Sequence, residues 1–274
     1  MTSNNSKPRP ALRMLHTSDV HLGAYDHGRG ESLDRMHDEL EQAFRLTIDM
    51  ALEQQVDVIL IAGDFVDNAR VRDETLHFAA SEIARAEVPV VVAPGNHDHV
   101  GPSSLYDRID FAAEAPNLRL MRVPGGETVA LPELEMEIWG RSHTEQEPRF
   151  TPFGDAPPRG EAAWQVAIGH GHYIHPAAAL QHSFHIYERE LAAMDRDYVA
   201  LGHWERQVRV AAGGGLAAYS GAPESLSGSV GGRVLIVSFD EGGGVRLEAP
   251  SLDGEAALAH DEIPFLEGAE IEFR

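Results

Sequence analysis

The chain has 274 residues, 43% of them apolar, which is enough for one large α/β domain with a continuous core. Its 44 acidic residues against 22 basic ones give a formal net charge of -22, which excludes a protein that grips nucleic acid through a broad basic face. The absence of cysteine excludes disulfides, thiolate zinc sites and a cysteine nucleophile, so any metal must bind oxygen and imidazole.

The N-terminal segment "MTSNNSKPRP" is polar and proline-containing, and it predicts a disordered arm over residues 1–10. No apolar run approaches the roughly 18 residues of a membrane span, and no signal-peptide pattern follows the arm. We therefore expect a cytoplasmic protein without membrane contact. Residues 11–274 contain no linker that forces a division, which predicts a single domain without a separate capping domain.

The chain after the arm begins with a strand and continues with a helix. The stretch "ALRMLHTSDVHLG" is an apolar run that ends in a polar turn, as a buried strand does at a sheet edge, and it brings Asp19 and His21 there. Apolar residues at helical spacing predict a helix over about 32–54, and a second helix is expected over about 72–87.

An apolar run follows each of these two predicted helices in the chain. The stretch "VDVILIAGDFVDN" predicts a strand covered on both faces that ends at Asp64. After the second helix, "VPVVVAPGNHDH" repeats the design and ends at Asn96, His97 and Asp98. Three predicted strands thus end in polar side chains.

The second half of the chain predicts mainly strands. Residues 116–163 indicate hairpins followed by a Pro/Gly-rich surface loop. The runs "WQVAIGHGHY" and "DYVALGHWER" predict two more buried strands, the first ending at His170 and the second at His203, with Glu205 two residues further on. Short apolar segments separated by glycines then predict antiparallel sheet.

All five apolar strands end in carboxylate, amide or imidazole side chains. Ligand sites of α/β folds gather outside the carboxyl ends of the strands, because the buried strands hold the loops there rigidly. One such ending arises often by chance, whereas the same ending on five strands in succession does not. A set this large suits two divalent ions that share a carboxylate. The candidate residues are Asp19, His21, Asp64, Asn96, His97, His170, His203 and Glu205.

The segments "DVHLG", "GDFVD", "GNHD", "GHG" and "GHWE", in this order, resemble the five blocks of the calcineurin-like metallophosphoesterases over about residues 12–240. The resemblance implies an α/β fold of two packed mixed β-sheets flanked by helices, in four αββα layers. It implies a first metal bound by Asp19, His21 and Asp64, and a second metal bound by Asp64, Asn96, His170 and His203. Asp64 would bridge the two ions.

The residue two positions after His203 is a histidine in this family and Glu205 here. Because glutamate is a good ligand for hard or borderline cations, we expect Glu205 to complete the first site and to favour Mn²⁺, with iron or zinc as alternatives. The competing hypothesis is an ion pair between Glu205 and Arg206. In the histidine-rich stretch "GHGHYIH", His172 is the alternative to His170 as the ligand.

The resemblance also implies roles in catalysis. Two divalent ions lower the pKa of a bridging water, so that hydroxide can attack the phosphorus atom at neutral pH. His97 is similar to the catalytic histidine of the family, which stabilises the transition state or protonates the leaving oxygen. Asp98 is expected to orient the ring of His97.

Within the superfamily, "SDVHLG", "VDVILIAGDFVDN" and "DYVALGHWERQ" followed by "YSGAPESLS" are similar to the SbcD-type DNA repair exonucleases. This similarity implies a phosphodiester substrate such as a DNA end and an SMC-like ATPase partner. The acidic charge and Asp67, found where these nucleases often carry a histidine, argue against it. The alternatives are a phosphodiesterase or phosphatase for small molecules or nucleotides and, as a third hypothesis, a non-catalytic scaffold.

Overall fold

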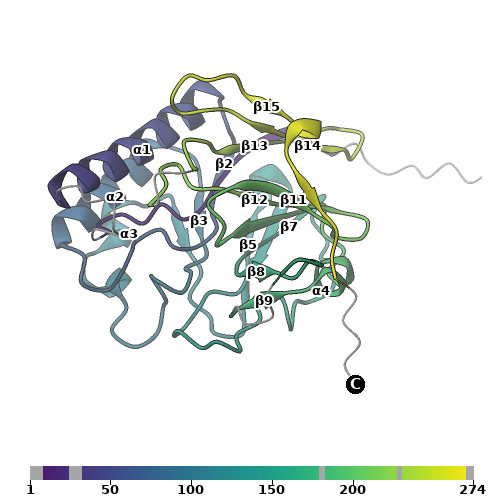
Figure 1. Ribbon diagram of the computed structural model, residues 1–274, viewed down its shortest axis with the longest axis horizontal. Coiled ribbons are helices and arrows are strands. Elements are labelled where there is room, and N and C mark those ends of the chain that lie inside the picture. Colours follow the sequence, from purple (N-terminus) through teal and green to yellow (C-terminus); the bar gives the residue numbers. More distant parts are fainter. Residues whose placement is uncertain (1–8, 25–32, 179–182, 227–229, 270–274) are drawn as a thin grey trace, which may run out of the picture.

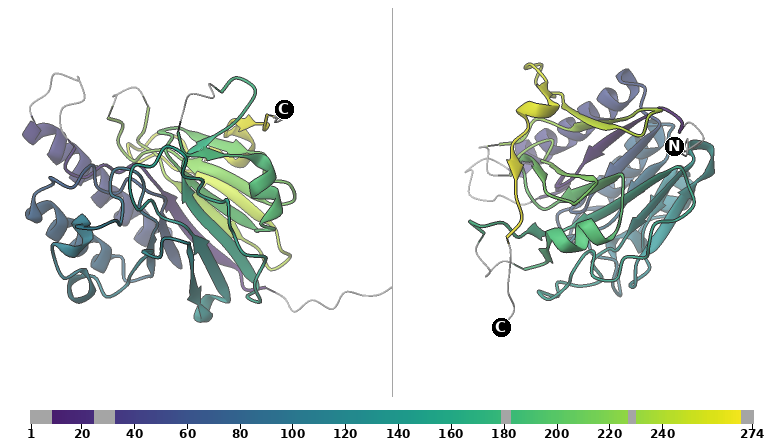
Figure 2. Two further views of the ribbon diagram at one scale, coloured as in Figure 1. Left: turned by 90° about the horizontal axis from the view of Figure 1, so that it is seen from below. Right: turned by 90° about the vertical axis from the view of Figure 1, so that its right-hand side faces the viewer.

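Two mixed β-sheets of seven strands each form the centre of the protein, as a computed structural model shows (Figure 1). The structure describes residues 9–24, 33–178, 183–226 and 230–269. The sheets pack face to face, and helices flank the pair on both outer sides (Figure 2). The predicted α/β fold of two packed mixed sheets is therefore confirmed.

The first sheet joins four parallel strands from the N-terminal half to three antiparallel strands from the C-terminal end. In order across the sheet, its strands are β15 (Leu258–Ala259), β14 (Val245–Ala249), β13 (Leu235–Phe239), β1 (Leu12–Thr17), β2 (Val58–Ile61), β3 (Val90–Val92) and β4 (Leu118–Leu120).

The second sheet has a parallel centre and antiparallel pairs toward its margins. In order, its strands are β16 (Phe265–Leu266), β11 (Gln207–Val210), β12 (Leu216–Ser220), β10 (Tyr198–Gly202), β7 (Trp164–His170), β6 (Met136–Gly140) and β5 (Glu127–Leu131). A separate small sheet pairs β8 (His172–Tyr173) with β9 (His185–Ile186).

The helices lie on the outer faces of the sheets. Their bounds are α1 (Leu33–Glu53), α2 (Asp73–Arg85), α3 (Phe111–Glu114) and α4 (Glu188–Ala193), with 3-10 turns at Leu105–Asp107, Pro132–Leu134 and His260–Glu262. Helix α1 buries Met36, Leu40, Phe44 and Ile48, which recur at helical spacing and pack on the outer face of the first sheet. Helix α4 and the small sheet cover the second sheet (Figure 2).

The core between the sheets explains the unbroken apolar runs of the central strands. Alternate residues of β2 face opposite ways: Val58 and Leu60 join the core shared by the two sheets, whereas Ile59 and Ile61 pack on the helix side. Ile168 of β7 and Ala200 of β10 contribute to the shared core from the second sheet. Strands buried on both faces need apolar residues at every position.

The carboxyl ends of the central strands meet at one edge of the sandwich. Strands β1, β2 and β3 are parallel to one another, and so are β7 and β10. The two sheets approach closely at this edge, since a Cβ on Gly202 would lie 1.8 Å from the carbonyl oxygen of Ala62. Any side chain larger than hydrogen at position 202 would therefore push apart the strand ends that position the site.

Three parts of the chain differ from the prediction. Strand β4 lies in the first sheet, parallel to β3, and not in a hairpin; the predicted hairpin is formed by β5 and β6. The expected surface loop contains the buried rings of Phe150 and Phe153, which pack on His143 and Trp139. The C-terminal strands are divided between the two sheets, because β11 and β12 pair with each other beside β10, whereas β13 and β14 extend from β1.

The N-terminal arm was predicted over residues 1–10, and its first eight positions lie outside the described residues. Residues 9 and 10 are held in place. Arg9 forms an ion pair with Asp197 at 2.9 Å and covers the ring of Trp164, whose indole nitrogen donates to the carbonyl oxygen of Pro10. Within the described ranges, no helix has the length and apolar character needed to cross a membrane.

Candidate metal centre

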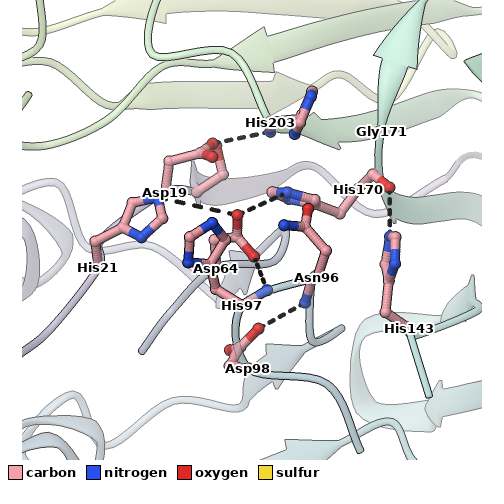
Figure 3. A network of polar contacts seen from close by, with 12 residues as sticks. Asp19, His21, Asp64, Asn96, His97, Asp98, His143, His170, Gly171 and His203 are labelled. Carbon is pink, nitrogen blue, oxygen red and sulfur yellow. Dashed lines mark hydrogen bonds and ion pairs between the residues drawn. The ribbon is translucent and has the colours of Figure 1, made fainter. Parts of the chain in front are cut away.

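The carboxylate of Asp64 is the centre of the site. It follows β2, and its Oδ2 lies 3.0 Å from Nε2 of His170 and 3.9 Å from Nε2 of His21 (Figure 3). Its Oδ1 accepts a hydrogen bond from the backbone nitrogen of His97 at 2.9 Å. His21 comes from the first sheet and His170 from the second, so Asp64 stands between imidazoles of both. This is the position of a carboxylate shared by two ions.

Four of the predicted ligands have a left-handed backbone. The φ angles are 54° for Asp19, 49° for His21, 50° for Asp64 and 108° for His203. Such conformations are unfavourable for residues other than glycine and persist where the surrounding structure enforces them, often at functional sites. Here the turns are tied together, since the nitrogen of Asp19 donates to Gly63 and that of His21 donates to Asp64.

Hydrogen bonds fix which nitrogen of each imidazole faces Asp64. Nδ1 of His170 lies 2.9 Å from the carbonyl oxygen of Ala62, and a carbonyl can only accept, so Nδ1 carries the hydrogen. Nδ1 of His21 lies 3.1 Å from Oδ1 of Asp67, which is likewise an acceptor. Both rings therefore direct Nε2 toward Asp64, the orientation in which metal-binding histidines are held.

The pair formed by His170 and Asp64 indicates that a cation belongs between them. Burial opposes a charge on His170, but the adjacent Asp64 carboxylate outweighs burial and raises the pKa of His170 to about 9. A proton or a metal ion can satisfy the two facing lone pairs. Oδ1 of Asn96 is also buried and lacks a hydrogen-bond partner within the described part of the chain. A carboxylate, an amide oxygen and imidazoles suit a divalent metal.

Two groups of donor atoms meet the spacing of a metal site. In each group, the candidate ligand atoms lie within 4.8 Å of one another. One group is His21, Asp64 and His97, and the other is Asp64, His170 and His203. The shared member is Asp64, so the residues present fit two neighbouring ions.

Asp19 connects the two sheets at the site. Its Oδ2 accepts hydrogen bonds from the backbone nitrogen of His203 at 2.9 Å and from Ser18 Oγ at 2.5 Å. Burial, together with the positive charge of His170, lowers the pKa of the His203 side chain to about 4. A neutral imidazole is the form that binds a metal, so His203 is ready to act as a ligand.

His97 lies beside Asp64 with part of its ring open to solvent. Its side chain is 35% exposed, and the ring packs edge-on against that of His21 at 4.8 Å. Nδ1 of His97 donates to the carbonyl oxygen of Asp67 at 2.7 Å and lies 3.6 Å from its carboxylate. Hydrogen bonding to Asp67 raises the pKa of His97 to about 9.

Asp98 occupies a different place from the one expected. It was predicted to orient the ring of His97, but its Oδ1 accepts from the backbone nitrogen of Gly95, and its Oδ2 accepts from that of Phe65 and from the hydroxyl of Tyr106. The hydrogen bonds to Phe65 and Gly95 hold the turns after β2 and β3 together. The structure therefore makes Asp98 a support for these turns and gives the contact with the His97 ring to Asp67.

From the sequence, Asp67 was identified only as a departure from the exonuclease pattern and was not predicted to be a site residue. In the structure it is buried, and it contacts the rings of both His21 and His97. Its position three residues after Asp64 in "GDFVDN" could have indicated a role in the site. The histidines that it contacts, however, come from other turns. His143 was also missed. Its ring is buried, and its Nε2 donates to the carbonyl oxygen of His170 at 2.9 Å.

Glu205 and His172 are engaged outside the two donor groups found in the described residues. The carboxylate of Glu205 accepts hydrogen bonds from Ser225 Oγ at 2.7 Å and from the backbone nitrogen of Leu226 at 3.2 Å. Nδ1 of His172 accepts a hydrogen bond from the indole nitrogen of Trp204 at 3.0 Å. Since Trp is a donor only, the neutral ring of His172 carries its hydrogen on Nε2.

The fold and this donor set are those of a metal-dependent phosphoesterase. The chain matches the family described as Calcineurin-like phosphoesterase over residues 12–206, and it belongs to that family. The resemblance found in the sequence is thereby confirmed.

Two curated proteins that are similar in sequence to part of this chain are named for DNA repair or nuclease activity. The "DNA double-strand break repair protein Mre11" of Aeropyrum pernix is 30% identical over 46% of this chain and 32% of its own length. The SbcD component of the SbcCD nuclease of Bacillus subtilis is 33% identical over 32% of this chain and 22% of its own length. The matched segments thus span no more than about a third of these relatives.

Solved structures share the fold along nearly the whole chain. The protein TT1561 of Thermus thermophilus superposes with a TM-score of 0.57 and 13% identity, covering 89% of this chain and 100% of the other. A dimetal phosphatase from Danio rerio gives a TM-score of 0.53 with 11% identity, covering 91% of this chain and 99% of the other. At these identities the likeness supports the fold alone.

Proposed function

We propose that this protein is a two-metal phosphodiesterase that acts on the ends of DNA. The observation that carries the proposal is the carboxylate of Asp64, which lies between the imidazoles of His21 and His170 with His97 beside it. The similarity to Mre11 and to the SbcCD nuclease supports DNA as the substrate.

The proposed ligands of the first ion are Asp19, His21 and Asp64, and those of the second are Asp64, Asn96, His170 and His203. When bound, two divalent ions would neutralise phosphoryl oxygens and lower the pKa of a water molecule. Manganese is the proposed metal because the donor set combines oxygen and imidazole without sulfur.

The residues of the chain would orient the substrate and move a proton. Nδ1 of His97 is occupied by the carbonyl oxygen of Asp67, so Nε2 is the atom that can donate a proton to the leaving oxygen. Asp67 also orients His21, which links the proton donor to the first ion. In this proposal Asp98 supports the turn that carries Asn96 and His97.

The net charge of -22 favours a second candidate, a phosphodiesterase for small molecules or nucleotides. A DNA-cleaving enzyme with this charge needs either a local grip on its substrate or a partner that supplies the basic surface. We therefore propose an SMC-like ATPase as the partner of the DNA-cleaving form, as the similarity to the SbcCD nuclease suggests.

The test is manganese-dependent hydrolysis of labelled single-stranded DNA and of bis(4-nitrophenyl) phosphate, with His97→Ala as the control for contaminating nuclease. Cleavage of both substrates that is lost in the variant supports the proposal. Cleavage of the small diester alone favours the small-molecule enzyme or a nuclease that needs its partner. Hydrolysis of neither substrate with any divalent metal contradicts both candidates.

A further inference from the structure

Trp204 follows the candidate ligand His203 directly, and its indole lies flat on the ring of Tyr219. The two ring centroids are 4.2 Å apart, and the ring planes differ by 15°. Tyr219 belongs to β12 and is fully buried. Its hydroxyl donates to the carbonyl oxygen of Gly171 at 2.7 Å and accepts from the backbone nitrogen of Tyr173 at 2.8 Å. The ring beneath the indole is therefore fixed.

The indole of Trp204 is also held at its edge, while part of it meets solvent. Its Nε1 donates to Nδ1 of His172 at 3.0 Å. One face covers Tyr219, yet Trp204 is only half-buried, whereas Trp139 and Trp164 are buried in the core. The exposed part of the indole therefore lies on the side that Tyr219 does not cover. A rigid aromatic surface in contact with solvent is preorganised to bind a flat ligand.

Trp204 is part of a row of rings that begins at the metal centre. The ring centroids of His203 and His172 are 6.1 Å apart, those of His172 and Trp204 are 5.2 Å apart, and those of Trp204 and His175 are 5.9 Å apart. All four residues are partly exposed. A single imidazole thus separates the indole from the candidate ligand His203. A nucleotide whose phosphate lies at the metal centre can reach the indole with its base.

We propose that Trp204 is a stacking platform for an unpaired nucleobase, that of a nucleotide beside the cleaved phosphodiester. The proposal rests on the proposed function, and it specifies single-stranded nucleic acid as the substrate class. Stacking on an aromatic side chain tolerates every base, because each base presents a π-face. A base inside a duplex has both faces covered by its neighbours, so the platform selects unpaired ends.

The platform accounts for how an acidic chain holds a nucleic acid. The net charge of -22 opposes the approach of phosphates, and binding through phosphates requires lysine and arginine contacts. The face of a base carries no net charge, so the acidic residues do not oppose stacking. Base stacking is therefore a local grip that this charge permits.

The experiment compares manganese-dependent cleavage of a labelled single-stranded DNA with that of the same strand carrying a tetrahydrofuran abasic residue beside the cleaved bond, on each side in turn. On one side, the base should raise kcat/KM of the wild type by about 5- to 150-fold, the range expected for stacking one base on an aromatic side chain. The loss in the abasic strand should fall on KM, because stacking holds substrate and transition state alike.

Three variants are compared through the ratio of kcat/KM for the intact strand to kcat/KM for the abasic strand. Trp204→Leu should bring this ratio to about one, since it removes the π-face. Trp204→Phe, which keeps a smaller ring, should retain part of it. Phe265→Leu is the control, because Phe265 is an exposed aromatic residue at the margin of the same sheet, and its replacement should leave the ratio unchanged.

Tryptophan fluorescence gives a second readout on the wild type, so it does not depend on the folding of a variant. The other two tryptophans, Trp139 and Trp164, are buried, so a stacked base should quench Trp204 selectively. A phosphorothioate version of the intact strand, added with magnesium at several times the KM of the cleaved strand, should quench the fluorescence more than its abasic counterpart.

Each failure has its own meaning. A wild type that cleaves intact and abasic strands equally well would overturn the platform and leave the proposed function intact. A ratio that persists in Trp204→Leu would place base recognition elsewhere and would also overturn it. Equal quenching by intact and abasic strands would contradict stacking on Trp204. Cleavage of neither strand would contradict the proposed function itself.

Discussion

Two buried histidines in different regions show what distinguishes the site from the core. His16 of β1 lies inside the protein, with Nδ1 2.8 Å from the hydroxyl of Tyr198, and burial lowers its pKa to about 3. His170 at the end of β7 is equally buried, but the carboxylate of Asp64 raises its pKa to about 9. Equal burial thus gives opposite shifts, because the facing group is a neutral hydroxyl in one case and a carboxylate in the other.

The comparison teaches that burial alone makes a neutral core histidine. A buried carboxylate facing the lone pair of an imidazole requires a cation, and a pair of such groups is costly unless one is present. The site departs from the core at its strand ends, where the sheets bring Asp64 and His170 together from opposite sides. Changes that disturb this pairing should affect metal binding, whereas changes at His16 should affect stability alone.

The largest effect is expected for Gly63→Ala, which would break the pairing. A Cβ at position 63 would lie 2.3 Å from Nδ1 of His170, and its φ of +85° is unfavourable for alanine. The strained backbone should cost about 1–3 kcal/mol of stability, and the displaced ring should lose the second ion. Chemical unfolding and manganese titration measure both losses. Gly125→Ala, where a Cβ would meet nothing within 4 Å, is the matched control and should change neither quantity.

A smaller effect is expected for Asp67→Asn, which removes the charge that orients two site histidines. Loss of such a supporting partner typically reduces activity by about 10- to 100-fold. The pKa of His97 should fall toward its ordinary value. As the pH is raised, the variant should therefore lose the protonated ring, and the activity that needs it, at a lower pH than the wild type does. The basic limb of the kcat profile should therefore move to lower pH. The control is Asn68→Ala, which leaves the Asp67 carboxylate in place and removes the hydrogen bond that Asn68 donates to it, together with the one that Asn68 accepts from the backbone nitrogen of Arg70.

An unmoved basic limb in Asp67→Asn, together with a small drop in kcat/KM, would contradict the role assigned to Asp67. Such a result would leave the contacts with His21 and His97 without a functional consequence.

His16→Gln sharpens the comparison from the side of the core. The folded-state pKa of His16 lies below its unfolded value of about 6.5, so the unfolded state binds the proton first as pH falls. The free energy of unfolding therefore decreases as the pH falls below about 6.5, because protonation of His16 favours the unfolded state, and it continues to decrease toward pH 3. Between pH 7 and pH 5 the wild type should lose about 2 kcal/mol more than the variant, as measured by chemical unfolding. Equal pH dependence would show that His16 is accessible to protons in the folded protein.

The sequence predicted most of the strands and the candidate ligands at their ends. It predicted few of the side-chain contacts between turns that are distant in the chain. The apolar runs placed Asp19, Asp64 and His170 at strand ends because burial on both faces demands apolar residues up to the turn. The partners of Asp98 could not be predicted in this way, since Gly95, Phe65 and Tyr106 meet only once the turns are packed.

The same limit explains three other differences. Glu205 reaches Ser225 across a segment whose path depends on the pairing of β12 with β10. Asp67 meets the ring of His97 because β2 and β3 are neighbours, which periodicity does not specify. The division of the C-terminal strands between two sheets follows from pairing of β13 with β1, and these strands are separated by most of the chain.

The most direct test of the central claim, that Asp64 is shared by two ions, is electron paramagnetic resonance of the manganese-loaded protein beside Asp64→Asn. Ions about 3.5–4 Å apart and bridged by a carboxylate should give an exchange-coupled dimanganese spectrum in the wild type. The variant should give the signal of isolated manganese or none. An isolated-manganese spectrum in a wild type shown to hold two ions would contradict the shared carboxylate.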